Sequence, residues 1–241
     1  DLNNIPELAY IVPDENGGLR LGSMTRHHQV ETSPLVAERA PLIHETMPKI
    51  AYPQVRSRGT FGGSVSHADP SAELVALSVA LDGSFRLRNR DGERWAPARE
   101  FFLGLFTTVM EPDELLVEAA LPPKPARSGW SLMEVARRPH DFALIGVAAV
   151  VTLDENDRCE QARMVFISAG DVPMVAHKAA ESLKGQAPTL EAIKATAEVA
   201  ASEDIDPGSD IHATAEFRRH LANVLSRRAL EQAFQRAADN K

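Results

Sequence analysis

The stretch VRSRGTFGGSVSHADPSAE, residues 55–73, is the most informative part of this sequence. Its three glycines and two hydroxyl residues lie within six positions, as Gly59, Thr60, Gly62, Gly63 and Ser64. Glycine has no Cβ, so a ligand can approach the backbone N–H groups closely. A loop of this kind before a helix is typical of a phosphate or pyrophosphate site. The pattern therefore predicts an anion-binding loop, with a helix beginning near Pro70.

The same residues allow other interpretations. A tight glycine turn with polar neighbours has a similar composition and is more frequent on composition alone. The spacing is not that of a Walker A loop, because no Gly-Lys-Ser/Thr follows, nor that of a Rossmann fingerprint, because no βαβ unit surrounds it. Arg56 and Arg58 precede the glycines and could either pair with phosphate or brace the fold. Glu73 could accept a hydrogen bond from a ribose hydroxyl.

Residue types of catalytic and metal sites also occur here, at spacings that do not suit them. Ser64, His67 and Asp69 lie within six positions, whereas triad members converge from different parts of a fold. His67 and Asp69 could ligate a metal together with His27, His28 or His44, but these residues lack the ligand spacing of a metal site. The spacing therefore argues against a hydrolase triad, and we predict no metal ion. The polar cluster at residues 137–141 fits either a solvated connection or a loop at a ligand site.

The composition is that of a globular protein. Of 241 residues, 44% are hydrophobic and 25% are charged, which allows one large domain or two modest ones. A formal net charge of −8 and an aromatic fraction of 5% argue against nucleic-acid binding, because an acidic surface repels phosphates and few rings are available for stacking. The longest apolar stretches, such as residues 145–153, are shorter than the roughly 18 residues of a membrane helix.

Cys159 is the single cysteine of the chain. One thiol cannot form an internal disulfide, and it cannot supply a cysteine-based zinc or iron–sulfur site. The polar start of the chain shows no signal-peptide pattern. These features fit a reducing compartment, and we expect a cytoplasmic protein.

A proline-rich linker at residues 121–125 marks the expected domain boundary, because proline fixes φ and favours extended backbone. We place one domain at residues 1–122 and a second at 126–241. In the first domain the sequence predicts a hairpin of 10–12 with 19–21, a helix capped by Ser33, a helix over 71–81, an edge-type strand at 85–88, a short helix at 98–104 and a strand at 115–121.

The second domain is expected to contain strands followed by helices. The strand candidates are residues 130–136, 144–153 and 162–168, and the helix candidates are 174–183, 190–200 and 213–238. Strands grouped before helices favour an α+β fold, here a three-stranded antiparallel sheet packed with helices.

Several segments together resemble one family. Residues 55–64, the run His67-Ala-Asp-Pro70 and the acid at 73 resemble the second FAD-binding motif of molybdenum hydroxylase flavoprotein subunits, of the carbon monoxide dehydrogenase and xanthine dehydrogenase type. Other segments resemble further parts of that subunit. Residues 21–25 resemble a strand leading into a threonine-started helix, 101–104 and 111–116 the end of the FAD domain, 134–143 the opening of the C-terminal domain, and 218–230 the final helix. The resemblance covers nearly the whole chain.

The resemblance implies FAD as the cofactor. The residues it marks as cofactor-binding are Thr60, Phe61, Gly62, Gly63, Ser64, Glu73, Leu116 and Ala51. Of these, the glycines with Thr60 and Ser64 would surround the pyrophosphate, and Glu73 stands on the adenosine side where the family usually has Asp. The family's first FAD motif, Ala-Gly-Gly-x-Ser, does not occur in this chain. We therefore expect the chain to begin inside the FAD domain.

The resemblance also implies a role in a complex. A large molybdopterin-binding subunit would hydroxylate the substrate, and a small subunit with [2Fe–2S] clusters would relay electrons to FAD on this chain, which would pass them to an external acceptor. Because the substrate would lie on another subunit, the resemblance implies no catalytic acid, base or nucleophile on this chain. A dimer of heterotrimers is expected. The alternative is a structural or assembly subunit that keeps the fold without FAD.

Overall fold

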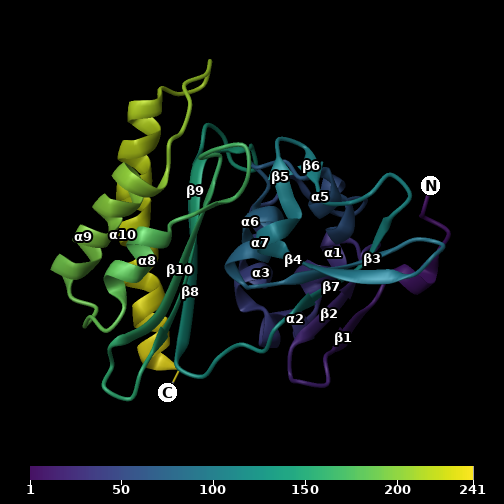
Figure 1. Ribbon diagram of the computed structural model, residues 1–241, viewed down its shortest axis with the longest axis horizontal. Coiled ribbons are helices and arrows are strands. Elements are labelled where there is room, and N and C mark those ends of the chain that lie inside the picture. The colour runs from purple at the N-terminus through teal and green to yellow at the C-terminus, as the bar shows by residue number, and fades with distance from the viewer. Residues whose placement is uncertain (241) are drawn as a thin grey trace. The chain divides into compact units, whose positions relative to one another are not determined.

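The computed structural model describes residues 1–240, and the chain divides into two compact units (Figure 1). The first comprises Asp1–Lys124 together with Pro139–Asp141, and the second comprises Pro125–Arg138 together with Phe142–Lys241. Each unit has its own sheet and its own helices, in agreement with the predicted α+β class.

The first unit is built on a five-stranded antiparallel sheet. Its strands follow in the spatial order β1 (Ile11–Pro13), β2 (Leu19–Gly22), β7 (Leu115–Leu121), β3 (Ser84–Arg88) and β4 (Glu93–Pro97). The predicted β1–β2 hairpin and the strand at 115–121 are confirmed. The prediction of β3 as an edge strand is wrong, because β7 and β4 pair with its two sides. Its alternating polarity reflects a sheet with one buried face, since Phe85 and Leu87 are buried.

Short helices surround this sheet. They are α1 (His27–Thr32), α2 (Pro34–Arg39), α3 (Pro41–Thr46), α4 (Pro53–Arg56), α5 (Phe61–His67), α6 (Glu73–Ala80) and α7 (Ala98–Phe101), with 3₁₀ turns at Pro6–Leu8 and Met47–Lys49 and a small hairpin of β5 (Phe102–Gly104) and β6 (Thr107–Thr108). Every residue of α6 is buried, so this helix forms the centre of the unit. The predicted helix at 98–104 is correct only as far as Phe101, because β5 begins at Phe102.

The Ser33 cap is confirmed in this unit, and two other local expectations are corrected. Ser33 caps α2, and its hydroxyl accepts a hydrogen bond from the N–H of Val36 at 3.3 Å. The expected helix divides in two at Pro41, because a proline cannot donate its backbone hydrogen bond and begins a new helix more easily than it continues one. The prediction of a helix that starts at Thr25 is wrong, because α1 begins at His27. Thr25 instead donates its hydroxyl to the Tyr10 carbonyl at 2.8 Å.

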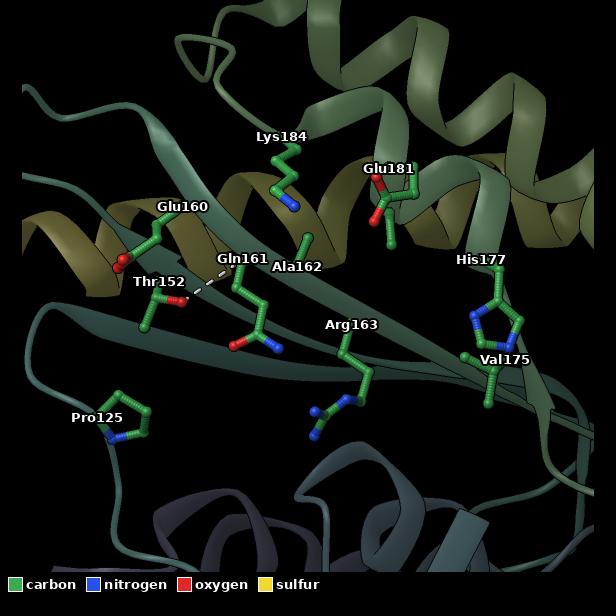
Figure 2. Close-up of a pocket in the computed structure, with 11 residues that line it drawn as sticks. Pro125, Thr152, Glu160, Gln161, Ala162, Arg163, Val175, His177, Glu181 and Lys184 are labelled. Carbon is green, nitrogen blue, oxygen red and sulfur yellow. Dashed lines mark hydrogen bonds between the residues drawn. The ribbon is translucent and has the colours of Figure 1, made fainter. Parts of the chain in front are cut away.

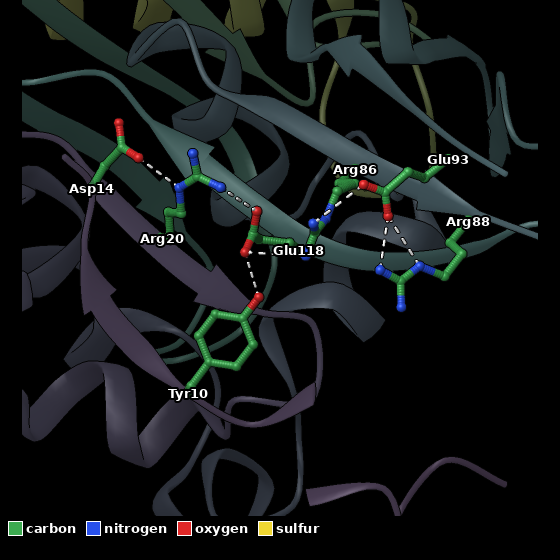
Figure 3. Close-up of polar contacts among 7 residues, drawn as sticks. All are labelled: Tyr10, Asp14, Arg20, Arg86, Arg88, Glu93 and Glu118. Carbon is green, nitrogen blue, oxygen red and sulfur yellow. Dashed lines mark hydrogen bonds and ion pairs between the residues drawn. The ribbon is translucent and has the colours of Figure 1, made fainter. Parts of the chain in front are cut away.

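One face of the sheet carries a row of charged side chains (Figure 3). Glu118 on β7 is buried and accepts hydrogen bonds from the Tyr10 hydroxyl and from Arg20 on β2, the latter at 3.1 Å. Arg86 on β3 reaches the same carboxylate at 3.5 Å. The guanidinium groups of Arg20 and Arg86 each lie 5.8 Å from the ring centroid of Trp95 on β4. These contacts link four neighbouring strands across the sheet.

The second unit has a four-stranded antiparallel sheet in the order β11-β10-β9-β8. Its elements are β8 (Ser128–Ala136), β9 (Ala143–Leu153), β10 (Cys159–Ile167), β11 (Met174–Val175), α8 (His177–Leu183), α9 (Leu190–Val199), a π-helical turn (Ala200–Asp204) and α10 (Ala215–Asp239). The three predicted strands are confirmed. The predicted helix at 174–183 begins only at His177, because Met174 and Val175 pair with β10 and add a fourth strand.

The core of this unit lies between the sheet and its helices. Ile145, Val147 and Ala149 on β9 alternate toward the helices and join the apolar side of α10 in one buried cluster. The helix lies very close to β8 at Gly129, where a Cβ would stand 1.8 Å from the carbonyl oxygen of Ala233. A glycine is therefore required for this helix–strand contact.

Candidate cofactor site

The glycine-rich segment is held by a second stretch of backbone, residues 23–27. The His27 N–H donates to the Gly59 carbonyl at 2.9 Å, and the Phe61 N–H donates to the Thr25 carbonyl at 2.9 Å. These two bonds flank the antiparallel bridge between Arg26 and Thr60. The segment is thus fixed on a rigid scaffold instead of forming a free loop.

The structure corrects the predicted form of this segment, because residues 61–67 form helix α5 and do not form a loop. Thr60 caps the helix, and its Oγ1 accepts a hydrogen bond from the Gly63 N–H at 3.1 Å. Glycine is a poor helix former, but a Cβ on Gly62 would stand 2.4 Å from the Cβ of Ser23. Close packing against Ser23 therefore explains why this helical position is a glycine.

The backbone N–H groups of the segment are engaged within the chain. Phe61 and Gly62 donate to the carbonyls of Thr25 and Ser23, at 2.9 and 2.8 Å, and Gly63 donates to its cap. The expected nest of free backbone donors is therefore not formed by these three groups. The Thr60 N–H and the Ser64 hydroxyl, in contrast, have no hydrogen-bond partner within residues 1–240.

A hollow of about 570 Å³ lies beside this segment in the first unit. It is lined by Asn3, Met24, Arg26, His27, Arg58, Gly59, Thr60, Gly63, Ser64 and His67. Two arginines and two hydroxyl residues are among these, and no carboxylate is. In a chain with a net charge of −8, this local excess of positive charge suits an anionic ligand.

The two arginines that precede the glycines have different roles. Arg56 is buried and donates to both oxygens of Glu31, at 2.9 and 3.1 Å, and to the carbonyls of Ile50 and Ala51, at 3.0 and 2.7 Å. It therefore braces the fold. Arg58 is exposed and lines the hollow. Sequence reasoning left both roles open for both residues, and burial distinguishes them.

His27 connects the backbone stretch 23–27 to the glycine-rich segment. Its Nε2 lies 2.9 Å from the Thr60 carbonyl oxygen, and because a carbonyl only accepts, Nε2 must carry the hydrogen. Its Nδ1 is buried without a partner. Burial lowers the pKa of His27 from its ordinary value of 6.5, and Arg56 lowers it further, while the bond to Thr60 acts in the opposite direction. The ring is therefore neutral at pH 7 and adds no charge to the hollow.

The structure gathers three of the eight predicted cofactor residues at this hollow, namely Thr60, Gly63 and Ser64. The other five do not line it. Phe61, Gly62, Glu73 and Leu116 are buried, and Ala51 is half-buried with a left-handed φ of 46°. Glu73 is the first residue of α6, and Leu116 pairs with Leu87 inside the sheet.

The residues considered as a hydrolase triad or as metal ligands are not brought together in the described structure. Ser64 and His67 lie on one short helix, and no hydrogen bond joins either of them to Asp69 within the described chain. The His67 ring instead stacks on Phe106, with ring centroids 4.9 Å apart. Within residues 1–240, no three His, Cys, Asp or Glu side chains come together as metal ligands.

A second hollow, of about 530 Å³, is lined by residues of the second unit (Figure 2). Acidic Glu160 and Glu181 share its wall with basic Arg163 and Lys184. Charges of both signs give it no preference for an anion. The hollow beside Thr60 is thus the better candidate for a phosphate-bearing ligand.

Comparison with known proteins identifies the family. Residues 1–124 match the family described as the FAD binding domain in molybdopterin dehydrogenase, and residues 130–233 match the CO dehydrogenase flavoprotein C-terminal domain. This chain belongs to the FAD-binding medium subunits of the molybdenum hydroxylase family. As a member, it is an oxidoreductase subunit whose cofactor is FAD.

Relatives of this flavoprotein subunit cover it over its whole length. The 6-hydroxypseudooxynicotine dehydrogenase complex subunit alpha of Paenarthrobacter nicotinovorans is 34% identical over 241 residues, which are 100% of this chain and 81% of the relative. The carbon monoxide dehydrogenase medium chain of Hydrogenophaga pseudoflava is 34% identical over 238 residues, with coverage of 99% and 82%.

Solved structures show the same fold. A carbon monoxide dehydrogenase of Hydrogenophaga pseudoflava superposes with a TM-score of 0.93 at 34% identity, covering 98% of this chain and 81% of the other. Quinoline 2-oxidoreductase of Pseudomonas putida 86 gives 0.92 at 32% identity, with coverage of 98% and 81%. No helix within residues 1–240 is long and apolar enough to cross a bilayer.

The features of this FAD subunit fit a dinucleotide. Hydroxyl donors, arginines and the absence of carboxylates at the hollow suit the negatively charged pyrophosphate of FAD. Sequence reasoning did not single out Asn3, Met24 and Arg26, and it considered His27 only as a metal ligand. No local pattern marks these residues, because the bridge from Arg26 to Thr60 joins positions 34 residues apart in the chain.

Proposed function

We propose that this chain is the electron-transferring flavoprotein subunit of a molybdenum-containing hydroxylase or dehydrogenase. It would take electrons from the [2Fe–2S] clusters of a small partner subunit and deliver them to an external acceptor. We assign an FAD-binding domain to residues 1–122 and the C-terminal flavoprotein domain to 126–241. The observation that carries the proposal is the carboxylate-free hollow beside Thr60, in a chain of an FAD-binding family.

The residues of this chain would bind and orient the cofactor. Thr60 and Ser64 offer hydroxyl donors, and Gly63 leaves the surface of α5 open to a phosphate. Phe61 and Gly62 hold that helix against residues 23–25. For Glu73, Leu116 and Ala51 we propose contacts to the remaining parts of FAD. Bound FAD would supply the redox chemistry, which protein side chains do not provide.

The metal centres of such an enzyme would lie on other chains. Cys159 is the only cysteine, and it is buried, with its pKa raised to about 11 by burial. A buried neutral thiol is a poor ligand for iron. We therefore propose a large molybdopterin-binding subunit and a small [2Fe–2S] subunit as partners, assembled as a dimer of heterotrimers in the cytoplasm. Two relatives that are named as a complex subunit and as a medium chain support the presence of partner subunits.

Spectroscopy of the purified complex tests the proposal. The complex should show flavin absorbance, and acid extraction should release FAD in a one-to-one ratio with this chain. Adding the reducing substrate without oxygen should bleach the flavin band after the iron–sulfur bands begin to change. A well-folded complex that contains the partner subunits and no flavin would instead support the FAD-free assembly subunit.

A further inference from the structure

Arg58 differs from the other arginines around the site. Its side chain makes no hydrogen bond or ion pair with any residue of the described chain, although it lines the hollow beside Thr60. Arg26, on the same wall, is already engaged, with one nitrogen donating to the Arg58 carbonyl and another to Asn3 Oδ1 at 2.7 Å. Arg56 is bound to Glu31. Arg58 is therefore the free cation of this wall within the described residues.

The local backbone leaves a role for such a cation. Three successive N–H groups, of Phe61, Gly62 and Gly63, are hydrogen bonded within the chain and cannot turn to a ligand. His27 is neutral. Hydroxyl groups can donate to a phosphate but cannot balance its charge, whereas a guanidinium does both and matches two phosphate oxygens at once.

We propose that Arg58 binds the pyrophosphate of FAD through its guanidinium group, and that Arg26 is the positioning residue that holds the Arg58 backbone at the edge of the hollow. This inference rests on the proposed function, because it takes FAD as the ligand. It assigns the selectivity of the hollow for a phosphorylated flavin to a side chain outside the glycine motif. Riboflavin, which lacks phosphate, has no group for Arg58 to bind.

Flavin titration of the deflavinated complex tests this assignment. The Arg58→Gln variant removes the charge and keeps a polar side chain. The matched control is Arg90→Gln, because Arg90 is also an exposed arginine without a partner in the described part of the first unit and lies in the turn between β3 and β4, away from the hollow. Binding of FAD and of riboflavin is followed by quenching of flavin fluorescence at several salt concentrations.

We expect Arg58→Gln to weaken FAD binding by about ten- to a hundredfold, the usual effect of losing a hydrogen bond to a charged group. Riboflavin binding should change less than about twofold, the salt dependence of FAD binding should become shallower, and Arg90→Gln should behave as the natural protein does. Arg58→Lys should recover part of the affinity, because it restores the charge without the planar fork.

Two results would overturn the inference while leaving the proposed function intact. One is an Arg58→Gln complex that binds FAD as tightly as the natural one. The other is an equal loss for FAD and riboflavin, which would indicate a damaged fold instead of a lost phosphate contact. A natural complex that binds no FAD at all would overturn both the inference and the proposed function.

Discussion

The imidazole Nε2 of His27 lies 2.9 Å from the carbonyl oxygen of Thr60, and this contact joins the start of α1 to the cap of α5. The backbone N–H of the same histidine holds the neighbouring Gly59 carbonyl at 2.9 Å. One residue therefore fixes two successive peptide groups at the entrance to the glycine motif. A Cβ on Gly59 would stand 3.0 Å from His27 Nδ1, so the ring and the segment are in close contact.

His27→Phe should destabilise the first unit by about 1–3 kcal/mol, because it leaves the Thr60 carbonyl without its donor. The substitution should also change how the free energy of unfolding depends on pH. Burial lowers the pKa of His27 in the folded state below 6.5, so the unfolded chain binds more protons and the natural protein loses stability as the pH falls through about 6.5. Arg56 is the charged group that acts on this ring.

Urea unfolding between about pH 5 and 8 measures this effect. In the His27→Phe variant the free energy of unfolding should fall less as the pH is lowered, because the imidazole that takes up a proton is absent. His220→Gln, at an exposed position of α10, should keep the natural pH profile. A His27→Phe protein with an unchanged profile would show that the ring does not titrate as the geometry implies.

Gly62→Ala should destabilise the first unit by about 1–3 kcal/mol, the usual cost of overpacking. The added Cβ would meet Ser23 at 2.4 Å from its Cβ and 2.7 Å from its Cα, so backbone must move. FAD content should fall with it, since α5 carries Thr60 and Ser64 on the hollow. Thermal unfolding and flavin content are the measurements. Gly92→Ala is the control, because nothing lies within 4 Å of a Cβ there.

Gly129→Ala should disrupt the second unit. A Cβ would stand 1.8 Å from the Ala233 carbonyl oxygen and 2.5 Å from the Ala237 nitrogen, both in the backbone of α10. Since neither can yield without moving the helix away from β8, we expect a loss above about 3 kcal/mol and poor expression of soluble protein. Gly208→Ala, in open space, should express normally. Equal stability of the two variants would contradict this packing.

Tyr10 should titrate late. Burial and its hydrogen bond to Glu118 raise its pKa to about 12. The folded state therefore holds the Tyr10 proton more tightly than the unfolded state does. The resulting contribution to the free energy of unfolding is fully present below the ordinary pKa of 10.0 and is lost as the pH rises through about 12. The chain has two tyrosines, so the difference in tyrosinate absorbance between the natural protein and Tyr10→Phe isolates this group. A difference that titrates near 10 would contradict the buried pair.

Some features of the fold are readable from the sequence, because they depend on near neighbours. The hairpin at Gly17, the Ser33 cap and the apolar run of β9 each follow from turn chemistry, capping or periodicity over a few residues. The two-residue strand β11 has no such pattern, and β3 looks like an edge strand although it is an inner one. Both features depend on which neighbouring strand pairs with these residues in the folded sheet.

The candidate site shows the same division. The sequence by itself determined the glycine motif, the family it resembles and the absence of a cysteine-based metal site. Only the tertiary structure decided that Arg56 is a buried brace while Arg58 stays free, that Arg26 and His27 complete the wall, and that the glycine N–H groups are already engaged. The physical reason is that hydrogen bonds between residues more than 20 positions apart depend on how distant segments pack, which no local pattern records.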